Sequence, residues 1–262
     1  MVSSPQLTRD LRAALSAGEL SVAFQPQFDL EASITPAGAA LAEPVAVEAL
    51  CRWNHALLGA VPPDTFIPLA EEGRFLDEVD LQVFERATER VTRWRESGHP
   101  LGLSVNASPA HFSRRYADTI VARLDRLGVD PVGMTVEITE APMPQLRPEM
   151  ITAMQALQSV GIAISVDDYA GGDTTVDMLE ALPIDEVKID RSLTQRTDAE
   201  AHDAVAAVVA SSAQHGWRVV AEGIETFADL QRSRDRGCDL GQGYLWGLPM
   251  PSEEMDALLA AV

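Results

Sequence analysis

Short apolar runs rich in valine and isoleucine alternate along this chain with longer amphipathic segments. Such alternation is typical of β/α units, in which a buried strand is followed by a helix that covers the sheet. The runs predict strands at residues 21–28, 44–53, 101–107, 133–139, 162–168, 185–190, 217–223 and 238–246. Eight β/α units make a TIM-like (β/α)8 barrel, so the pattern predicts an α/β fold of this type.

The segments between these runs have the spacing of amphipathic helices. From Leu76 the apolar positions follow three- and four-residue steps, and Gly98 ends the run. Leucines at positions 7, 11 and 15 predict a leading helix within residues 1–20. Residues 21–250 are then the barrel and residues 251–262 a C-terminal helix, so that residues 1–262 form a single domain.

The link between the first two predicted strands contains no clear helix. It covers residues 29–43 and is polar, with proline and several alanines. A parallel pair of strands needs a crossover of a dozen or more residues, which is usually helical. A hairpin is the easier connection, and we therefore expect the first strand to run antiparallel to its neighbour.

The composition narrows the classes of partner. The 262 residues include 20 Lys plus Arg and 40 Asp plus Glu, which gives a formal net charge of −20. Such a surface repels DNA, RNA and anionic lipid, so we expect neither a nucleic-acid polymer nor a membrane as a partner. No apolar stretch has the length of a signal peptide or a membrane span, and a cytoplasmic location is expected.

Polar side chains occupy the predicted C-terminal ends of seven of the eight strands. In chain order they are Glu48, Asn106, Glu137, Asp167 with Asp168, Lys188, Glu222 and Gln242. Each acid alone is more often a cap or a surface charge than a site residue. Barrel active sites lie at this end of the strands, however, and the convergence of so many polar groups on one rim predicts a functional site.

Side-chain alternation indicates which of these residues face the rim. Lys188 points opposite to Val187 and Ile189, as expected if those two face the outer helices. Asp167 and Asp168 are adjacent, so both can reach one site only if the strand breaks there, which the glycines at 171 and 172 permit.

A pocket with four or five carboxylates needs cations to compensate their charge. Carboxylate and amide oxygens suit hard ions such as Mg²⁺ or Mn²⁺. The five histidines show no HExxH or paired spacing, which argues against zinc. An acid between two ions, for which Asp167 is well placed, is typical of two-metal phosphoryl chemistry.

Along nearly its whole length the chain resembles the EAL family of cyclic di-GMP phosphodiesterases. The name motif is Glu48-Ala49-Leu50, and the matching strings that follow in family order are VPPDTFIPLAEE, SVNAS, VEITE, SVDD, VKIDR, VVAEGIET and GQGYLWGLPMP. The resemblance implies a barrel with an antiparallel first strand. It also implies the hydrolysis of cyclic di-GMP to 5′-pGpG with two Mg²⁺ or Mn²⁺ ions per site.

Carried over by position, the resemblance implies ligands and catalytic groups. The ligands of the two ions would be Glu48, Asn106, Glu137, Asp167, Asp168 and Glu222, with Asp167 shared between the ions. Lys188 would position the attacking water, and Glu222 would assist its deprotonation. The residues that contact substrate or order the site would be Gln25, Arg52 and Gln242. Glu140 would support the loop after the two aspartates, and Glu225 could orient a ligand from outside.

The loop after the two aspartates departs from the family pattern. Residues 169–175 read YAGGDTT, with Ala170 at a family glycine and Asp173 at an aromatic position. A left-handed backbone at position 170 would strain alanine. Because this loop couples metal binding to dimer contacts in the family, the departure leaves turnover and homodimerisation open.

Two other functions compete with hydrolysis. One is a catalytically weak or inactive domain that binds cyclic di-GMP or a partner protein; with either function the regulatory partner is unknown. The other is a Schiff-base lyase that uses Lys188 on the same barrel architecture. The acids around Lys188 stabilise its ammonium form and so disfavour the lyase. A complete set of acidic residues favours hydrolysis over the receptor.

Overall fold

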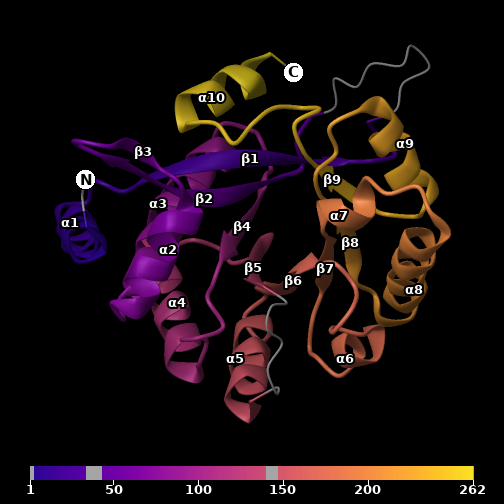
Figure 1. Ribbon diagram of the computed structural model, residues 1–262, viewed down its shortest axis with the longest axis horizontal. Helices are drawn as coiled ribbons and strands as arrows, with labels where there is room; N and C mark the ends of the chain where they lie inside the picture. The colour runs from indigo at the N-terminus through magenta and orange to yellow at the C-terminus, as the bar shows by residue number, and fades with distance from the viewer. Residues whose placement is uncertain (1–2, 34–42, 140–146, 262) are drawn as a thin grey trace.

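The computed structural model describes residues 3–33, 43–139 and 147–261, and in them a ring of strands is surrounded by helices (Figure 1). The strands are β1 Ser21–Asp29, β2 Ala46–His55, β3 Gly59–Val61, β4 Gly102–Asn106, β5 Met134–Thr139, β6 Ala163–Tyr169, β7 Glu186–Ile189, β8 Arg218–Ala221 and β9 Leu240–Gln242. The helices are α1 Ser4–Ala17, α2 Pro63–Glu72, α3 Leu76–Glu96, α4 Arg114–Leu127, α5 Pro148–Gln158, α6 Val176–Glu180, α7 Arg191–Thr194, α8 Ala199–His215, α9 Phe227–Asp235 and α10 Ser252–Ala260.

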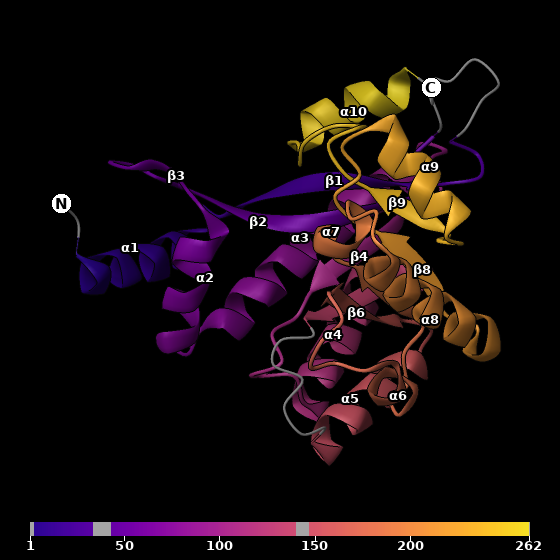
Figure 2. The same ribbon diagram turned by 45° about the vertical axis from the view of Figure 1, so that its right-hand side comes forward.

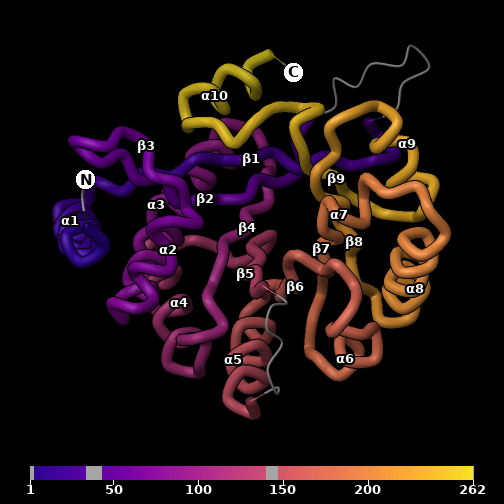
Figure 3. The backbone as a smooth tube through the Cα atoms, viewed as in Figure 1, coloured from indigo at the N-terminus to yellow at the C-terminus, as the bar shows by residue number. Residues whose placement is uncertain are grey.

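The strands other than β3 close a mixed eight-stranded barrel. Their order is β1-β9-β8-β7-β6-β5-β4-β2, and β1 also pairs with β2. All pairs from β2 through β9 around the ring are parallel, whereas β1 is antiparallel to both of its neighbours. The tube in Figure 3 shows the first and last strands side by side where the barrel closes. The predicted barrel and its antiparallel first strand are confirmed.

Each of the eight predicted strands is present, and two details differ from the expectation. The short strand β3 was not predicted; it extends the outer end of β2 as a hairpin outside the barrel. Strand β9 ends at Gln242, earlier than the predicted residue 246. It ends there because Gly243 packs directly against the backbone of Ile224, whose carbonyl accepts from the Leu245 N–H at 2.9 Å.

The apolar residues form two cores. The larger lies between the outer face of the barrel and the surrounding helices. The smaller joins α1 to α2 and the outer end of β2 through Leu11, Leu15, Trp53 and Phe66. In Figure 2 these elements form a lobe at one side of the barrel. The helix predicted within residues 1–20 is present as α1; the extent of the domain, residues 1–262, stays a prediction.

The inside of the barrel is polar. On β7, Val187 and Ile189 belong to the outer core, whereas Glu186 and Lys188 are fully buried on the inward face. At the end of the barrel away from the strand tips, Arg218 pairs with Glu186 at 2.6 Å. Charged groups therefore replace the branched aliphatic residues that usually fill a barrel interior.

Candidate active site

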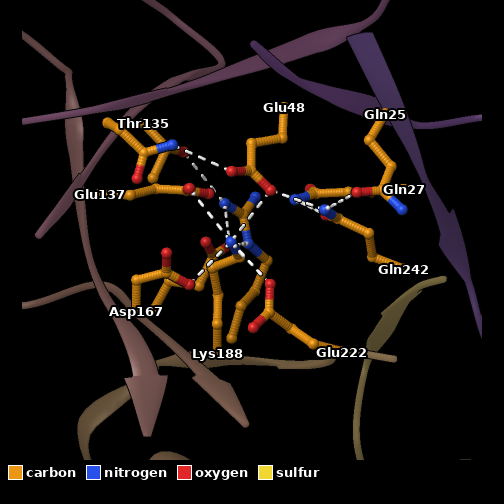
Figure 4. A network of polar contacts seen from close by, with 12 residues as sticks. Gln25, Gln27, Glu48, Thr135, Glu137, Asp167, Lys188, Glu222 and Gln242 are labelled. Atoms are coloured by element: carbon orange, nitrogen blue, oxygen red, sulfur yellow. Dashed lines mark hydrogen bonds and ion pairs between the residues drawn. The ribbon is translucent and has the colours of Figure 1, made fainter. Parts of the chain in front are cut away.

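Lys188 lies at the centre of four carboxylates (Figure 4). Its Nζ is 2.8 Å from both Asp167 Oδ1 and Glu222 Oε1, 3.1 Å from Glu137 Oε2 and 3.2 Å from Glu48 Oε2. The side chains of Lys188 and Glu137 are 0% exposed. A single ammonium group is thus shared by four acids that water barely reaches.

The strand register explains this convergence. Parallel strands end at the same edge of a sheet, and inward-facing residues of neighbouring strands fall level with one another. Asn106 of β4 is level with Glu137 of β5, and Glu222 follows directly after β8. The predicted rim residues that the structure brings together are Glu48, Asn106, Glu137, Asp167, Lys188, Glu222 and Gln242.

The acids form two groups, each compact enough to surround a cation. The first is Glu48, Glu137 and Asp167, and the second is Asp167, Asp168 and Glu222. Within each group one oxygen per residue lies within 4.8 Å of the others. Asp167 belongs to both groups, which is the arrangement expected of a ligand shared between two ions.

Burial and mutual repulsion shift the pKa values of these acids in different directions. Burial, followed by the nearby Glu48 charge, holds the pKa of Glu137 well above its usual range. Burial likewise raises the pKa of Glu222 to about 8. Burial also disfavours ionisation of Glu48, yet Lys188 and hydrogen bonds from Gln242 and Asn106 hold its pKa below the ordinary value. Glu48 is therefore an ionised carboxylate even without a bound cation.

In the presence of a chelator, the free energy of unfolding is expected to fall as the pH rises from about 5 to about 8. The pKa of Glu222 is about 8 in the folded protein against an ordinary 4.5, and that of Asp168 is about 6 against 3.8. A raised folded pKa stabilises the protein fully below the ordinary pKa, and this contribution is lost as the pH passes through the folded value. Urea unfolding at several pH values measures the fall. Glu222→Gln should flatten its upper part, and an unchanged slope in that variant would contradict the assignment.

Two amides donate hydrogen bonds to the Glu48 carboxylate, and two more contact one of these amides. Asn106 donates to Glu48 Oε1 at 2.9 Å, and Gln242 donates to Glu48 Oε2 at 2.6 Å. Gln242 also donates to Gln25 at 3.0 Å and accepts from Gln27 at 2.9 Å. Gln27 was missed in the sequence, although the two-residue period of a strand from Gln25 would have placed it on the same face.

Asp168 reaches the rim through a local break in β6. The register with β7 shifts between Val166 and Tyr169, and Asp168 has a φ of 61°. The break therefore lies at Asp168 itself, ahead of the glycines at 171 and 172. In the described residues, positive φ outside glycine occurs only at Arg74 and Asp168, so Ala170 carries no such strain. The substitution of a family glycine by Ala170 is thus compatible with the backbone.

A cavity of about 840 Å³ opens beside the acids. Its lining includes Glu48, Arg52, Asp167 and Asp168, together with apolar residues of α2 and α3. The guanidinium of Arg52 donates to the Cys51 carbonyl at 2.9 Å and is half-buried in the cavity wall. The cavity has the size of a small-molecule site, and Arg52 and Arg147 in its lining bring positive charge beside the acidic rim.

Glu140 and Glu225 are the remaining predicted site residues. Glu140 lies outside the described residues. Glu225 is exposed, and its backbone N–H donates to Asp229 at the start of α9. A role for Glu225 in orienting a ligand stays a prediction.

The chain belongs to the EAL domain family, whose model matches residues 8–249. It is 33% identical over 256 residues to the oxygen sensor protein DosP of Escherichia coli, covering 96% of this chain and 31% of DosP. It is 32% identical over 259 residues to the bifunctional diguanylate cyclase/cyclic di-GMP phosphodiesterase MucR of Pseudomonas aeruginosa, covering 97% and 36%. The chain thus spans about a third of the length of these curated relatives.

Solved structures agree with this assignment. The PaMucR phosphodiesterase in complex with c-di-GMP superposes with a TM-score of 0.84 at 31% identity, covering 95% of this chain and 99% of that one. The EAL enzyme Bd1971, bound to cAMP and cyclic di-GMP, has a TM-score of 0.85 at 23% identity and covers 98% and 69%. The latter likeness concerns the fold alone.

The acidic cluster has the composition of a site for hard divalent cations. Its ligand atoms are carboxylate oxygens, and Glu137 Oε1 is buried without a hydrogen-bond donor in the described part of the chain. The two acid groups together contain five acids, and Lys188 supplies one ammonium, so full ionisation would leave four negative charges, the charge that two divalent cations neutralise. The residues present therefore fit a two-cation centre.

Proposed function

We propose that this chain is a cyclic di-GMP phosphodiesterase that opens one phosphodiester bond to release 5′-pGpG. The observation that carries the proposal is the pair of acid groups sharing Asp167 beside the 840 Å³ cavity. The names of MucR and of the PaMucR complex supply the substrate class. In the reaction a water oxygen bonds to phosphorus, the P–O3′ bond breaks and the leaving O3′ takes up a proton.

The proposed ligands of the two cations are Glu48, Asn106, Glu137, Asp167, Asp168 and Glu222. Mg²⁺ or Mn²⁺ would supply Lewis acidity toward the phosphate and lower the pKa of a bound water. Glu48 suits the role of cation ligand because its neighbours keep it ionised, whereas Glu137 must release a proton to bind a cation. Cation binding is therefore expected to release protons.

Other groups of the chain would orient water and substrate. Lys188 Nζ, held between Asp167 and Glu222, is a donor beside the shared acid and can fix a water molecule there. Glu222, whose Oε1 lies 2.8 Å from Lys188 Nζ, is next to the place where Lys188 would fix water and is our choice of proton acceptor. Arg52 offers a guanidinium to an anionic substrate at the cavity wall.

The described residues contain no helix long and apolar enough to cross a membrane. We propose the cytoplasm as the location and residues 1–262 as one functional EAL domain. Because the loop of residues 169–175 departs from the family pattern, a homodimer stays a prediction.

The test incubates the purified chain with cyclic di-GMP and Mg²⁺ or Mn²⁺ and identifies the products by chromatography. Release of pGpG is expected with either ion, none with excess chelator, and none from Glu48→Ala. Binding of cyclic di-GMP without any release in the presence of metal would instead make the chain a receptor. Retained hydrolysis in Glu48→Ala would disprove the assignment of this site.

A further inference from the structure

Gln27 lies behind the candidate site and is connected to the acids through one intervening residue, Gln242. It is on β1, level with Gln242 of β9, and is 1% exposed. Its Nε2 donates to Gln242 Oε1 at 2.9 Å, and Gln242 Nε2 in turn donates to Glu48 Oε2 at 2.6 Å. Figure 4 shows this row of amides pointing at the carboxylate.

The two ends of a glutamine amide have opposite polarity: the NH2 group donates hydrogen bonds and the carbonyl oxygen accepts them. Only the NH2 group stabilises a neighbouring carboxylate. If the amide of Gln242 turned over, its carbonyl oxygen would face both Glu48 Oε2 and Gln25 Oε1, which accept hydrogen bonds in the present arrangement. The acceptor atom of the Gln242 amide is Oε1, and it accepts its hydrogen bond from Gln27 Nε2.

We infer that Gln27 is a positioning residue that fixes the amide of Gln242 in the orientation that donates to Glu48. Its side chain donates to Gln242, and Gln27 is not among the residues that line the cavity. Glu48 Oε2 is then held between Gln242 and Lys188, while Glu48 Oε1 is held by Asn106.

Fixing this carboxylate matters because Glu48 belongs to the first acid group, and its two oxygens are oriented by Gln242, Lys188 and Asn106. A ligand that is already held in the correct orientation loses less conformational freedom when a cation binds. This inference rests on the proposed two-cation function, and its consequence is seen in cation affinity before any nucleotide is added.

The test uses Gln27→Glu, which keeps the size of the side chain but replaces its donor with an acceptor. A carboxylate at position 27 repels Gln242 Oε1 and favours the turned amide, so that the carbonyl faces Glu48. The dissociation constant for Mn²⁺, measured without nucleotide by electron paramagnetic resonance of the free ion, is expected to rise about tenfold. Gln27→Met, which removes the donor without adding a charge, is expected to raise it about threefold and guards against misfolding of the charged variant.

Gln158→Glu is the matched control. Gln158 donates to Asp185 at 2.8 Å, at the end of the barrel away from the acidic cluster. Like Gln27→Glu, this substitution places a carboxylate next to a hydrogen-bond acceptor. It is expected to lower the melting temperature while leaving Mn²⁺ affinity unchanged. If Gln27 had a purely structural role, both Gln27 variants would likewise have a lower melting temperature and unchanged Mn²⁺ affinity. That result would overturn the inference.

Different outcomes would contradict the proposed function and the positioning role of Gln27. If the wild-type chain bound no Mn²⁺, the proposed function would fail. If the wild type bound Mn²⁺ and both Gln27 variants bound it equally well, the positioning role alone would be wrong. At saturating Mn²⁺ the variants should recover kcat to within about threefold of wild type with KM unchanged, because excess cation compensates for weaker binding.

Discussion

Lys188→Met is expected to lower the free energy of unfolding of the cation-free protein by about 3–5 kcal/mol at neutral pH, the cost typical of a buried charge that loses its partner. Four acids share this one ammonium within 3.2 Å, and its own pKa is held well above the usual range by them despite burial. Removing it leaves Glu48 without its principal counter-charge. Urea unfolding in excess chelator measures the loss.

Divalent cations should restore much of this stability but not the activity. Mn²⁺ can supply the missing positive charge, whereas the donor that orients water is absent, and the rate is expected to stay about 10²–10³-fold below wild type. Glu222→Gln is the comparison, since it removes one acid and leaves Lys188 with three. If Lys188→Met were as stable as wild type in chelator, the central role of this ammonium in the acidic cluster would be refuted.

The barrel and most of the rim could be predicted because both depend on local periodicity. Lys188 between Val187 and Ile189 shows its direction by alternation alone, and the apolar approach of each strand locates its end. The positions of acids from distant strands then follow from barrel geometry, which places the C-terminal ends of the parallel strands at one face.

The features that could not be predicted depend on contacts that produce no periodic pattern in the sequence. The left-handed φ of Asp168 arises from a register shift between β6 and β7. The role of Gln27 arises from a partner 215 positions away. The early end of β9 arises from the close approach of Gly243 to Ile224. Each is a property of packing between segments rather than of either segment by itself.

Asp167→Asn is expected to abolish binding of both cations, whereas substitutions of unshared acids should each weaken mainly one. Asp167 alone belongs to both acid groups in the described residues, and its carboxylate is also one of the two nearest partners of Lys188. A neutral amide at this position offers one oxygen instead of two and no charge. Loss of the cations should remove about 4 kcal/mol or more of transition-state stabilisation, a rate decrease on the order of 10³-fold.

The number of Mn²⁺ ions bound per chain distinguishes the loss of a shared ligand from a general loss of negative charge. Glu137→Gln lacks an acid of the first group only, and Glu222→Gln lacks an acid of the second group only. Each should retain about one tightly bound ion in a titration followed by electron paramagnetic resonance, while Asp167→Asn retains none. Two ions bound to Asp167→Asn would mean that the acid groups do not share a ligand. Because all three changes are near-isosteric and remove one negative charge, a difference among them reports the shared position of Asp167.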